Sequence, residues 1–335
     1  MSMTFHDEVT QRLHRSELTV PASNSAFIEK ARFAPADVIC LDLEDSVAPE
    51  DKSRARANVI AALNDLDWGT KTLNVRVNGL DTEYTYRDVI EITEACPRLD
   101  MLFLPKIGVP ADVYAIDTLV TQVEMAKRRK KRIGFEVMIE TALGLCNIEA
   151  IAQSSSRLEA MCFGSGDFAA STGARLVDIG VLNPDYGILG AAAEGGARPY
   201  FLADPWHAVQ ARIVAAARAY GLRPIDGPFS DFRDTEGSAV SSKRAAAIGF
   251  EGRMVIHPSQ ISSANEIFSP TEREIAYAQS IKQALGQAAR EGRGAVTLNG
   301  RMVDRANIRM AERVLQKVNA IAQNNGTSQL MRIST

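Results

Sequence analysis

The chain has 335 residues, of which 46% are hydrophobic and 24% charged, the composition of an ordinary globular protein. A net charge of -3 gives no reason to expect nucleic acid or an anionic membrane surface as a partner. No segment approaches the roughly 20 apolar residues of a membrane span. The N-terminal "MSMTFHDEVTQRLHR" lacks the apolar stretch of a signal peptide, and the cysteine spacing fits neither a zinc site nor a disulfide framework. We therefore expect a cytoplasmic protein with buried, reduced thiols.

Short apolar runs alternate with helical patterns along most of the chain, which predicts a parallel β-sheet. No run is followed by GxGxxG or GxxxxGK[ST], so neither a Rossmann nor a P-loop site is indicated. A count of about eight runs favours a closed (β/α)8 TIM barrel, an α/β fold, over an open doubly wound sheet. The runs are residues 16–21, 38–45, 73–78, 101–107, 133–140, 160–168, 222–229 and 253–258.

Two segments exceed what a plain barrel needs. The gap after the sixth run predicts a long irregular insertion over about 174–205, and long loops of this kind often act as lids. After the eighth run, Asn299-Gly300 between "VTL" and "RMV" predicts a β-hairpin, followed by an amphipathic helix. We therefore expect the barrel over 1–270 and a hairpin-plus-helix extension over 271–335 that packs on its own barrel or on a neighbour.

The ends of the predicted strands are unusually polar. Active sites of TIM barrels form at the C-terminal ends of the strands, where such side chains meet at one mouth. A single charged strand end is usually a solvent-facing loop residue, but a set of them is hard to dismiss. The set comprises Glu44, Asp45, Arg76, Lys106, Glu140, Asp167, Asp226 and His257.

The acids of this set offer only hard oxygen ligands. Without a convergent His/Cys set they suit Mg²⁺ or Mn²⁺ better than zinc. Because Mg²⁺ commonly takes only one or two protein carboxylates, some of these acids are expected to lie outside the coordination sphere. The four acids are Glu44, Asp45, Glu140 and Asp167.

The sequence resembles the citrate lyase β-subunit-like aldolases, and within them the malyl-CoA lyase (β-methylmalyl-CoA lyase) branch. The similarity runs from about Arg15 to about Ala322. It rests on "LDLEDSVAPEDKSRARAN", "VRVNGLDT", "LPKIG", "MIETALG", "FGSGDFAAS", "PIDGPFSDF" and "IHPSQI" in the family's order, and on the "DPWH" and "NGRMVD" segments.

The resemblance implies a TIM-barrel lyase that cleaves 3-hydroxyacyl-CoA thioesters with Mg²⁺. The expected reaction converts malyl-CoA reversibly to acetyl-CoA and glyoxylate, with β-methylmalyl-CoA as a further substrate. It also implies a homo-oligomer, a trimer or a hexamer, whose C-terminal segments complete neighbouring sites.

Roles carry over by position. Glu140 and Asp167 match the metal ligands, Arg76 matches the arginine that holds the keto-acid fragment, and Asp304 matches an acid delivered by a neighbouring subunit. Glu44 and Asp45 are then expected to orient metal-bound waters and to pair with Arg76 or Lys106, and Asp42 is expected to point to the other face. The substrate-binding positions are Thr19, Asn24, Lys30, Arg76, Gly166, Asp167, Ile256 and His257.

Some positions depart from the family's pattern. Ala22 replaces a glycine, Asn24 stands where several relatives carry arginine, and Thr19 where some carry an aromatic residue. Gly166 replaces the more usual alanine before the aspartate.

Alternatives remain open for several residues and for the activity. Asp304 also suits the N-cap of the helix that begins "RANIRMAE", and Arg76 could serve a structural ion pair. His257 reads as structural or CoA-lining. A malyl-CoA thioesterase and a catalytically silent CoA-binding paralogue are the competing functions.

Overall fold

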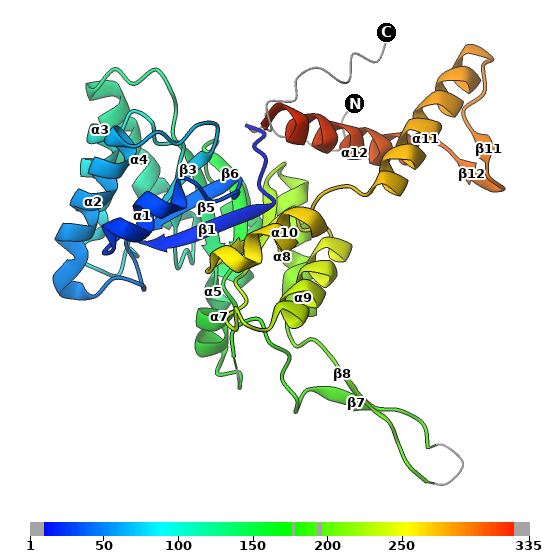
Figure 1. Ribbon diagram of the computed structural model, residues 1–335, viewed down its shortest axis with the longest axis horizontal. Helices are drawn as coiled ribbons and strands as arrows, with labels where there is room; N and C mark the ends of the chain where they lie inside the picture. The colour runs from blue at the N-terminus through cyan, green and yellow to red at the C-terminus, as the bar shows by residue number, and fades with distance from the viewer. Residues whose placement is uncertain (1–9, 176–177, 193–195, 325–335) are drawn as a thin grey trace. The chain divides into compact units, whose positions relative to one another are not determined.

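A computed structural model describes residues 10–175, 178–192 and 196–324 (Figure 1). The chain forms two compact units, one up to Asn265 and one from Glu266 onward. None of the helices that the structure describes is both long and apolar enough to pass through a membrane.

The first unit is a closed barrel of eight parallel strands, which confirms the predicted fold. Its strand order follows the chain, and β1 closes the barrel by pairing with both β2 and β10. Each of the eight strands overlaps a predicted run, although β3, β6 and β10 begin one or two residues earlier and several runs also contain the polar loop that follows the strand. The strands are β1 (Ser16–Pro21), β2 (Val38–Asp42), β3 (Thr72–Arg76), β4 (Met101–Leu104), β5 (Gly134–Ile139), β6 (Leu158–Phe163), β9 (Arg223–Asp226) and β10 (Gly252–Val255).

Helices follow the strands and cover the outside of the barrel. Strand residues are almost entirely buried because one side faces the barrel interior and the other faces the helices. The helices are α1 (Ser25–Ala31), α2 (Lys52–Asp65), α3 (Thr85–Ala95), α4 (Pro110–Ala126), α5 (Ala142–Cys146), α6 (Ile148–Ala152), α7 (Ser165–Thr172), α8 (His207–Ala219), α9 (Thr235–Ile248) and α10 (Ile261–Ile267). Short 3₁₀ turns, η1 (Pro49–Asp51) and η2 (Pro258–Gln260), precede α2 and α10.

The sequence predicts an irregular insertion after β6, but the described part of the insertion contains regular structure. It contains an antiparallel hairpin of β7 (Gly187–Leu189) and β8 (Tyr200–Leu202), which stands clear of the barrel strands in Figure 1. The Tyr200 ring occupies the space that a side chain at Gly187 would need, so glycine permits this cross-strand contact. The hairpin exposes large apolar side chains, namely Tyr186, Ile188, Leu189, Tyr200, Phe201 and Leu202.

The second unit contains the predicted hairpin and helix. Asn299 and Gly300 have φ angles of 50° and 73°, as a tight hairpin turn between β11 (Val296–Leu298) and β12 (Arg301–Val303) requires. They lie between α11 (Glu272–Arg290) and α12 (Arg305–Asn324). A small apolar core joins these elements: Ala278, Ile281, Leu285, Val303 and Ala311, flanked by Val296, Leu298, Ile308, Val314 and Leu315.

Three of the four cysteines are buried, as the sequence suggested, and all four thiols are free. Cys146, at the end of α5, is exposed, so the expectation of burial is wrong for this residue.

Candidate active site

Arg76 anchors a charged cluster at the C-terminal ends of β2 and β3. Its Nε and Nη2 donate to the two carboxylate oxygens of Asp42 at 2.6 and 2.7 Å. Its Nη1 lies 3.1 Å from Oε2 of Glu44. Burial lowers the pKa of Arg76, but the charge and hydrogen bonds of Asp42 outweigh it and raise the pKa well above its usual range. The guanidinium is therefore a permanent, fixed cation at the barrel mouth.

Asp42 corrects an expectation from the sequence. It was expected on the other face, but it is fully buried beside Arg76 and also accepts from the backbone N–H of Glu44 at 2.9 Å. Strand alternation has a period of two residues, so Asp42 belongs on the same side as Glu44 and Cys40. Because Asp42 and Glu44 are two residues apart, the alternation of side chains along a strand would have placed Asp42 on the side of the site.

Lys106 links three of the predicted site acids. Its Nζ lies 2.6 Å from Oε1 of Glu44 and 3.3 Å from Oδ1 of Asp45. Its backbone N–H donates to Oε1 of Glu140 at 2.7 Å. Lys106 has a φ of 55°, which is uncommon for a residue with a side chain and often marks a functional site. The predicted pairing of Glu44 and Asp45 with Arg76 or Lys106 is thus present.

Glu140 follows directly after β5 and is 2% exposed. Burial, together with the charges of Glu44 and Asp167, raises its pKa to about 8. Glycine at position 164 makes room for this carboxylate, because a Cβ atom there would lie 2.6 Å from Oε2 of Glu140. The site therefore gathers more negative charge around Glu140 than its cations balance, and hard oxygen donors dominate it. These properties fit a divalent cation such as Mg²⁺.

Asp167 lies in the first turn of α7, directly after β6, and is half-buried. Its charge helps to raise the pKa of the Glu140 carboxyl group, so the two predicted metal ligands lie within electrostatic range of each other. Its neighbour Gly166 is covered by Ile179 of the insertion, since a Cβ atom at residue 166 would lie 3.1 Å from Cδ1 of Ile179. An alanine at this position would require the Ile179 side chain to shift by a few tenths of an ångström.

Lys52, the first residue of α2, is buried although it is a lysine. Its Nζ donates to the carbonyl oxygens of Leu43 and Glu44, each at 2.7 Å. Burial lowers its pKa, which nearby acids raise only in part. The side chain therefore fixes the turn that presents Glu44 to Arg76 and Lys106.

Replacement of Lys52 by methionine is expected to leave these two carbonyl oxygens unpaired and to lower the free energy of unfolding by about 2 kcal/mol. Urea unfolding measures this change, with Arg54→Met on the same helix as the control, because the Arg54 side chain is 63% exposed. Equal effects of the two substitutions would show that Lys52 does not fix the turn.

The residues predicted to bind the CoA portion lie at two places on the first unit. Thr19 is in β1, and its buried Oγ1 has no hydrogen-bond partner within the described ranges. Asn24 is the N-cap of α1, accepting from the Phe27 N–H at 3.1 Å, and Lys30 is exposed in the last turn of that helix. Ala22 is buried and does not have a positive φ angle, so a glycine is not required there.

Ile256 and His257 follow β10, and Ile256 is 40% exposed. The His257 ring stacks on Phe232 with ring centroids 4.5 Å apart, and its Nδ1 lies 2.8 Å from Oγ of Ser259. These contacts agree with a structural or lining role for the histidine.

Asp226, at the end of β9, is held below the surface by Arg253. Its Oδ2 accepts from Nη2 of Arg253 at 2.8 Å, and its Oδ1 accepts from Nε2 of Gln210 at 3.1 Å. Asp226 is therefore part of a buried ion pair with Arg253. Its position at a strand end did not indicate this partner.

Asp304 lies in the second unit, where it caps α12. Its Oδ1 accepts from the Ala306 N–H at 2.8 Å, and its own N–H donates to Oδ1 of Asn307 at 2.9 Å. The capping alternative is therefore present, and a further role as an acid delivered to a neighbour remains a prediction.

A TIM barrel with acids and an arginine at its mouth is a fold and site that many lyases share, and the sequence identifies the class. Residues 15–258 match the HpcH/HpaI aldolase/citrate lyase family. The chain belongs to this family, and it is a lyase.

Within the family, the chain is 47% identical over 318 residues to the L-malyl-CoA/beta-methylmalyl-CoA lyase of Rhodobacter capsulatus. The aligned region covers 95% of this chain and 98% of that protein. It is 34% identical to the malyl-CoA/beta-methylmalyl-CoA/citramalyl-CoA lyase of Chloroflexus aurantiacus, covering 86% and 82% of the two chains. The solved structure of CitE from Mycobacterium tuberculosis with magnesium, acetoacetate and coenzyme A has a TM-score of 0.67 at 28% identity, covering 92% and 98%. These relatives confirm the resemblance to the malyl-CoA lyase branch.

Proposed function

We propose that this lyase cleaves malyl-CoA reversibly to acetyl-CoA and glyoxylate, and β-methylmalyl-CoA to propionyl-CoA and glyoxylate. The observation that carries the proposal is the buried Glu140 carboxyl group, with a pKa near 8, facing the charges of Asp167 and Glu44. The malyl-CoA lyases that are 47% identical over nearly the full chain support the same substrates.

Glu140 and Asp167 are the residues that would hold Mg²⁺, with Mn²⁺ as an alternative ion. When bound, the ion supplies Lewis acidity and a fixed orientation for substrate oxygens. The CitE relative, solved with magnesium and coenzyme A, supports this assignment. Glu44 and Asp45 are proposed to lie outside the coordination sphere, since Lys106 and Arg76 already pair with Glu44 and Lys106 with Asp45.

In the cleavage direction the substrate hydroxyl releases its proton to solvent water, and its oxygen becomes the aldehyde oxygen of glyoxylate. The electron pair of the broken C–C bond remains as the enolate of acetyl-CoA. Arg76, fixed by Asp42, is placed to hold the carboxylate of the keto-acid fragment and to stabilise developing oxyanion charge. Asp304 of a neighbouring subunit would protonate the enolate carbon, and would abstract the same proton during condensation.

The CoA portion is proposed to contact Thr19, Asn24, Lys30, Ile256 and His257, with Gly166 bordering the glyoxylate end. Thr19 offers an unpartnered hydroxyl and Lys30 an exposed cation at one end of α1. The capping role of Asn24 occupies its side-chain oxygen, which leaves its amide NH₂ group as the donor to a ligand.

A homo-oligomer follows from the role given to Asp304, and the family resemblance implies a trimer or a hexamer. The exposed apolar side chains of the β7–β8 hairpin support assembly, because surfaces of this kind commonly mark interfaces. In the second unit, Met302 and Met310 are also exposed apolar side chains, at 74% and 67%. The cytoplasmic location remains a prediction from the sequence.

Incubation with malyl-CoA and Mg²⁺ tests the proposed reaction, with glyoxylate trapped as its phenylhydrazone. A lyase forms glyoxylate and acetyl-CoA in equal amounts. Release of free CoA and malate without glyoxylate would identify a thioesterase instead, and no turnover would indicate a silent CoA-binding paralogue. Parallel assays with methylmalyl- and citramalyl-CoA define the acyl preference.

Binding of Mg²⁺ is expected to depend on pH through Glu140. Its folded-state pKa of about 8 lies above the ordinary value of 4.5, so the folded metal-free protein holds a proton that the unfolded chain releases. The free energy of unfolding of the metal-free protein therefore falls as the pH rises from about 4.5 to about 8, and Glu140 causes no further loss above pH 8. Because Mg²⁺ displaces this proton, its apparent affinity should rise up to about tenfold per pH unit below pH 8.

Calorimetric titration of Mg²⁺ in buffers of different ionisation enthalpy measures the proton released. Glu140→Gln should abolish that release, whereas Glu149→Gln should leave it unchanged, because Glu149 is an exposed residue of α6. An affinity for Mg²⁺ that stays constant between about pH 6 and pH 8 would exclude Glu140 as a ligand that must lose a proton.

A further inference from the structure

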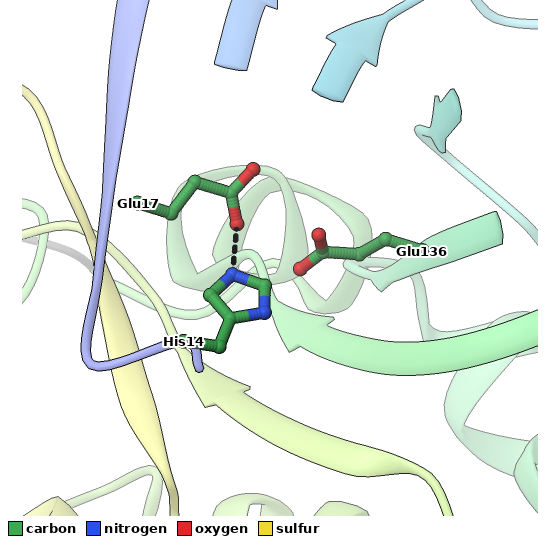
Figure 2. A group of neighbouring side chains, drawn as sticks. All are labelled: His14, Glu17 and Glu136. Atoms are coloured by element: carbon green, nitrogen blue, oxygen red, sulfur yellow. Dashed lines mark hydrogen bonds and ion pairs between the residues drawn. The ribbon is translucent and has the colours of Figure 1, made fainter. Parts of the chain in front are cut away.

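The barrel interior carries a second group of acids near the N-terminal ends of its strands. Glu17 of β1, Asn74 of β3 and Glu136 of β5 are all fully buried, and His14 just before β1 is 2% exposed. Layers of this kind in TIM barrels are dominated by bulky branched apolar residues. Figure 2 shows the side chains of His14, Glu17 and Glu136 directed toward one another. This group plays no part in the proposed reaction.

Few donors serve the two buried carboxylates. Nε2 of His14 lies 2.7 Å from Oε2 of Glu17. The single amide of Asn74 donates to both acids, to Oε1 of Glu17 at 3.0 Å and to Oε2 of Glu136 at 2.8 Å. Glu17 and Glu136 thus share their amide donor, and only Glu17 has the imidazole.

Three atoms of this group have no hydrogen-bond partner among the residues that the structure describes. They are Nδ1 of His14, Oδ1 of Asn74 and Oε1 of Glu136. Nearly all buried polar atoms in proteins have a partner or an ordered water or ion, so a cluster of exceptions points to a species bound among them.

The neighbouring cations pair mainly with other acids, although Nε of Arg223 has no hydrogen-bond partner within the described residues. Nη2 of Arg223 lies 3.1 Å from Oε2 of Glu159, and Nε of Arg12 lies 2.7 Å from the same oxygen. Arg12 also pairs with Asp100, which in turn contacts Lys131 and Arg98. Burial and the charge of Glu17 raise the pKa of Glu136 well above its usual range, whereas Arg223 lowers it only in part. In the metal-free protein the Glu136 carboxyl group therefore holds a proton, which a bound cation would displace.

We propose that His14, Glu17 and Glu136 bind a divalent transition-metal ion at a structural site distinct from the barrel mouth. One ligand atom from each residue lies within 4.8 Å of the others, which is close enough for the three to share one ion. A shared proton would join only two of these atoms, whereas a metal ion engages all three. One imidazole nitrogen with two carboxylates suits Zn²⁺, Mn²⁺ or Fe²⁺ and is a poor set for Mg²⁺.

Metal analysis of the intact protein tests this site directly. Protein grown with added ZnCl₂ and gel-filtered in Mg²⁺ buffer should retain about one transition-metal ion per chain, because the buried ligands slow exchange. Protein refolded with CoCl₂ should show the visible absorption of a Co²⁺ ion with an imidazole ligand. Chelation of the metal at high temperature should lower the melting temperature of the protein.

Matched variants locate the ion. His14→Gln and Glu136→Gln should each lose the transition metal, and both keep a polar side chain of similar size. Glu159→Gln should retain it, since Glu159 is a buried acid of β6 that pairs with Arg12 and Arg223 rather than with the cluster. Asp167→Asn should also retain it while losing Mg²⁺ binding, which separates this site from the one at the mouth.

Wild-type protein without bound transition metal after both treatments would overturn the proposal and would show that a proton neutralises the cluster. Retention of the metal by Glu136→Gln, or its loss from Asp167→Asn, would also overturn it. If the cluster variants fail to fold, the analysis of the wild-type protein decides alone.

Discussion

Replacement of Asp167 by asparagine is expected to lower the rate of malyl-CoA cleavage by about 10³-fold or more, because a lost metal ligand removes several kcal/mol of transition-state stabilisation. The substitution keeps the size of the side chain in the first turn of α7. It also removes one of the charges that raise the pKa of Glu140, so that pKa should fall. Steady-state kinetics and Mg²⁺ titration of the same preparation measure both consequences.

A control for this substitution is Asp65→Asn, the same change at an exposed position of α2. Its turnover and Mg²⁺ affinity should match those of the wild type. Turnover of Asp167→Asn within about twofold of the wild type would refute the metal assignment, because an amide is a poor substitute for a carboxylate ligand.

The barrel could be predicted from the sequence because its signal is local. Eight apolar runs separated by helical patterns allow few arrangements, and parallel strands with right-handed crossovers close in chain order. The turn at Asn299-Gly300 was equally readable, since positive φ angles at both positions restrict the residues that fit.

The partners of the charged residues could not be predicted in the same way. Lys52 looks like an ordinary helix residue, yet the turn after β2 folds over its amino group. Lys106 pairs with Glu44 from a backbone with a positive φ angle, and that conformation is a property of the fold that the residue type does not reveal. The hairpin of the insertion was also missed, because each of its strands has only three residues.

The charges at the mouth are arranged before any substrate binds. Arg76 is held by the two hydrogen bonds that it donates to Asp42, which also accepts from the backbone N–H of Glu44. A cation oriented in this way need not reorganise as oxyanion charge develops. The absence of this reorganisation energy is the main source of electrostatic catalysis. Asp42 should therefore influence turnover through the position of Arg76, without touching substrate.

Mixed oligomers test whether the mouth and the tail of different chains form one site. Arg76→Lys keeps a cation beside Asp42 but loses the two-pronged geometry of the guanidinium. Asp304→Asn removes the acid but keeps a good N-cap for α12, so the helix should remain folded. Each variant alone is expected to lose at least about 10²-fold in turnover.

Co-expression of the two variants with different tags, followed by purification on both, yields mixed oligomers. If the tail of one chain completes the mouth of another, both an intact Arg76 and an intact Asp304 occur in one of the three sites of every mixed trimer, and in about a quarter of the sites of randomly mixed hexamers. Roughly a quarter to a third of wild-type activity should then return. If each tail serves its own barrel, no site contains both residues and activity stays low. An inactive mixture would therefore contradict the shared site, whereas full activity of Asp304→Asn alone would leave Asp304 with its capping role only.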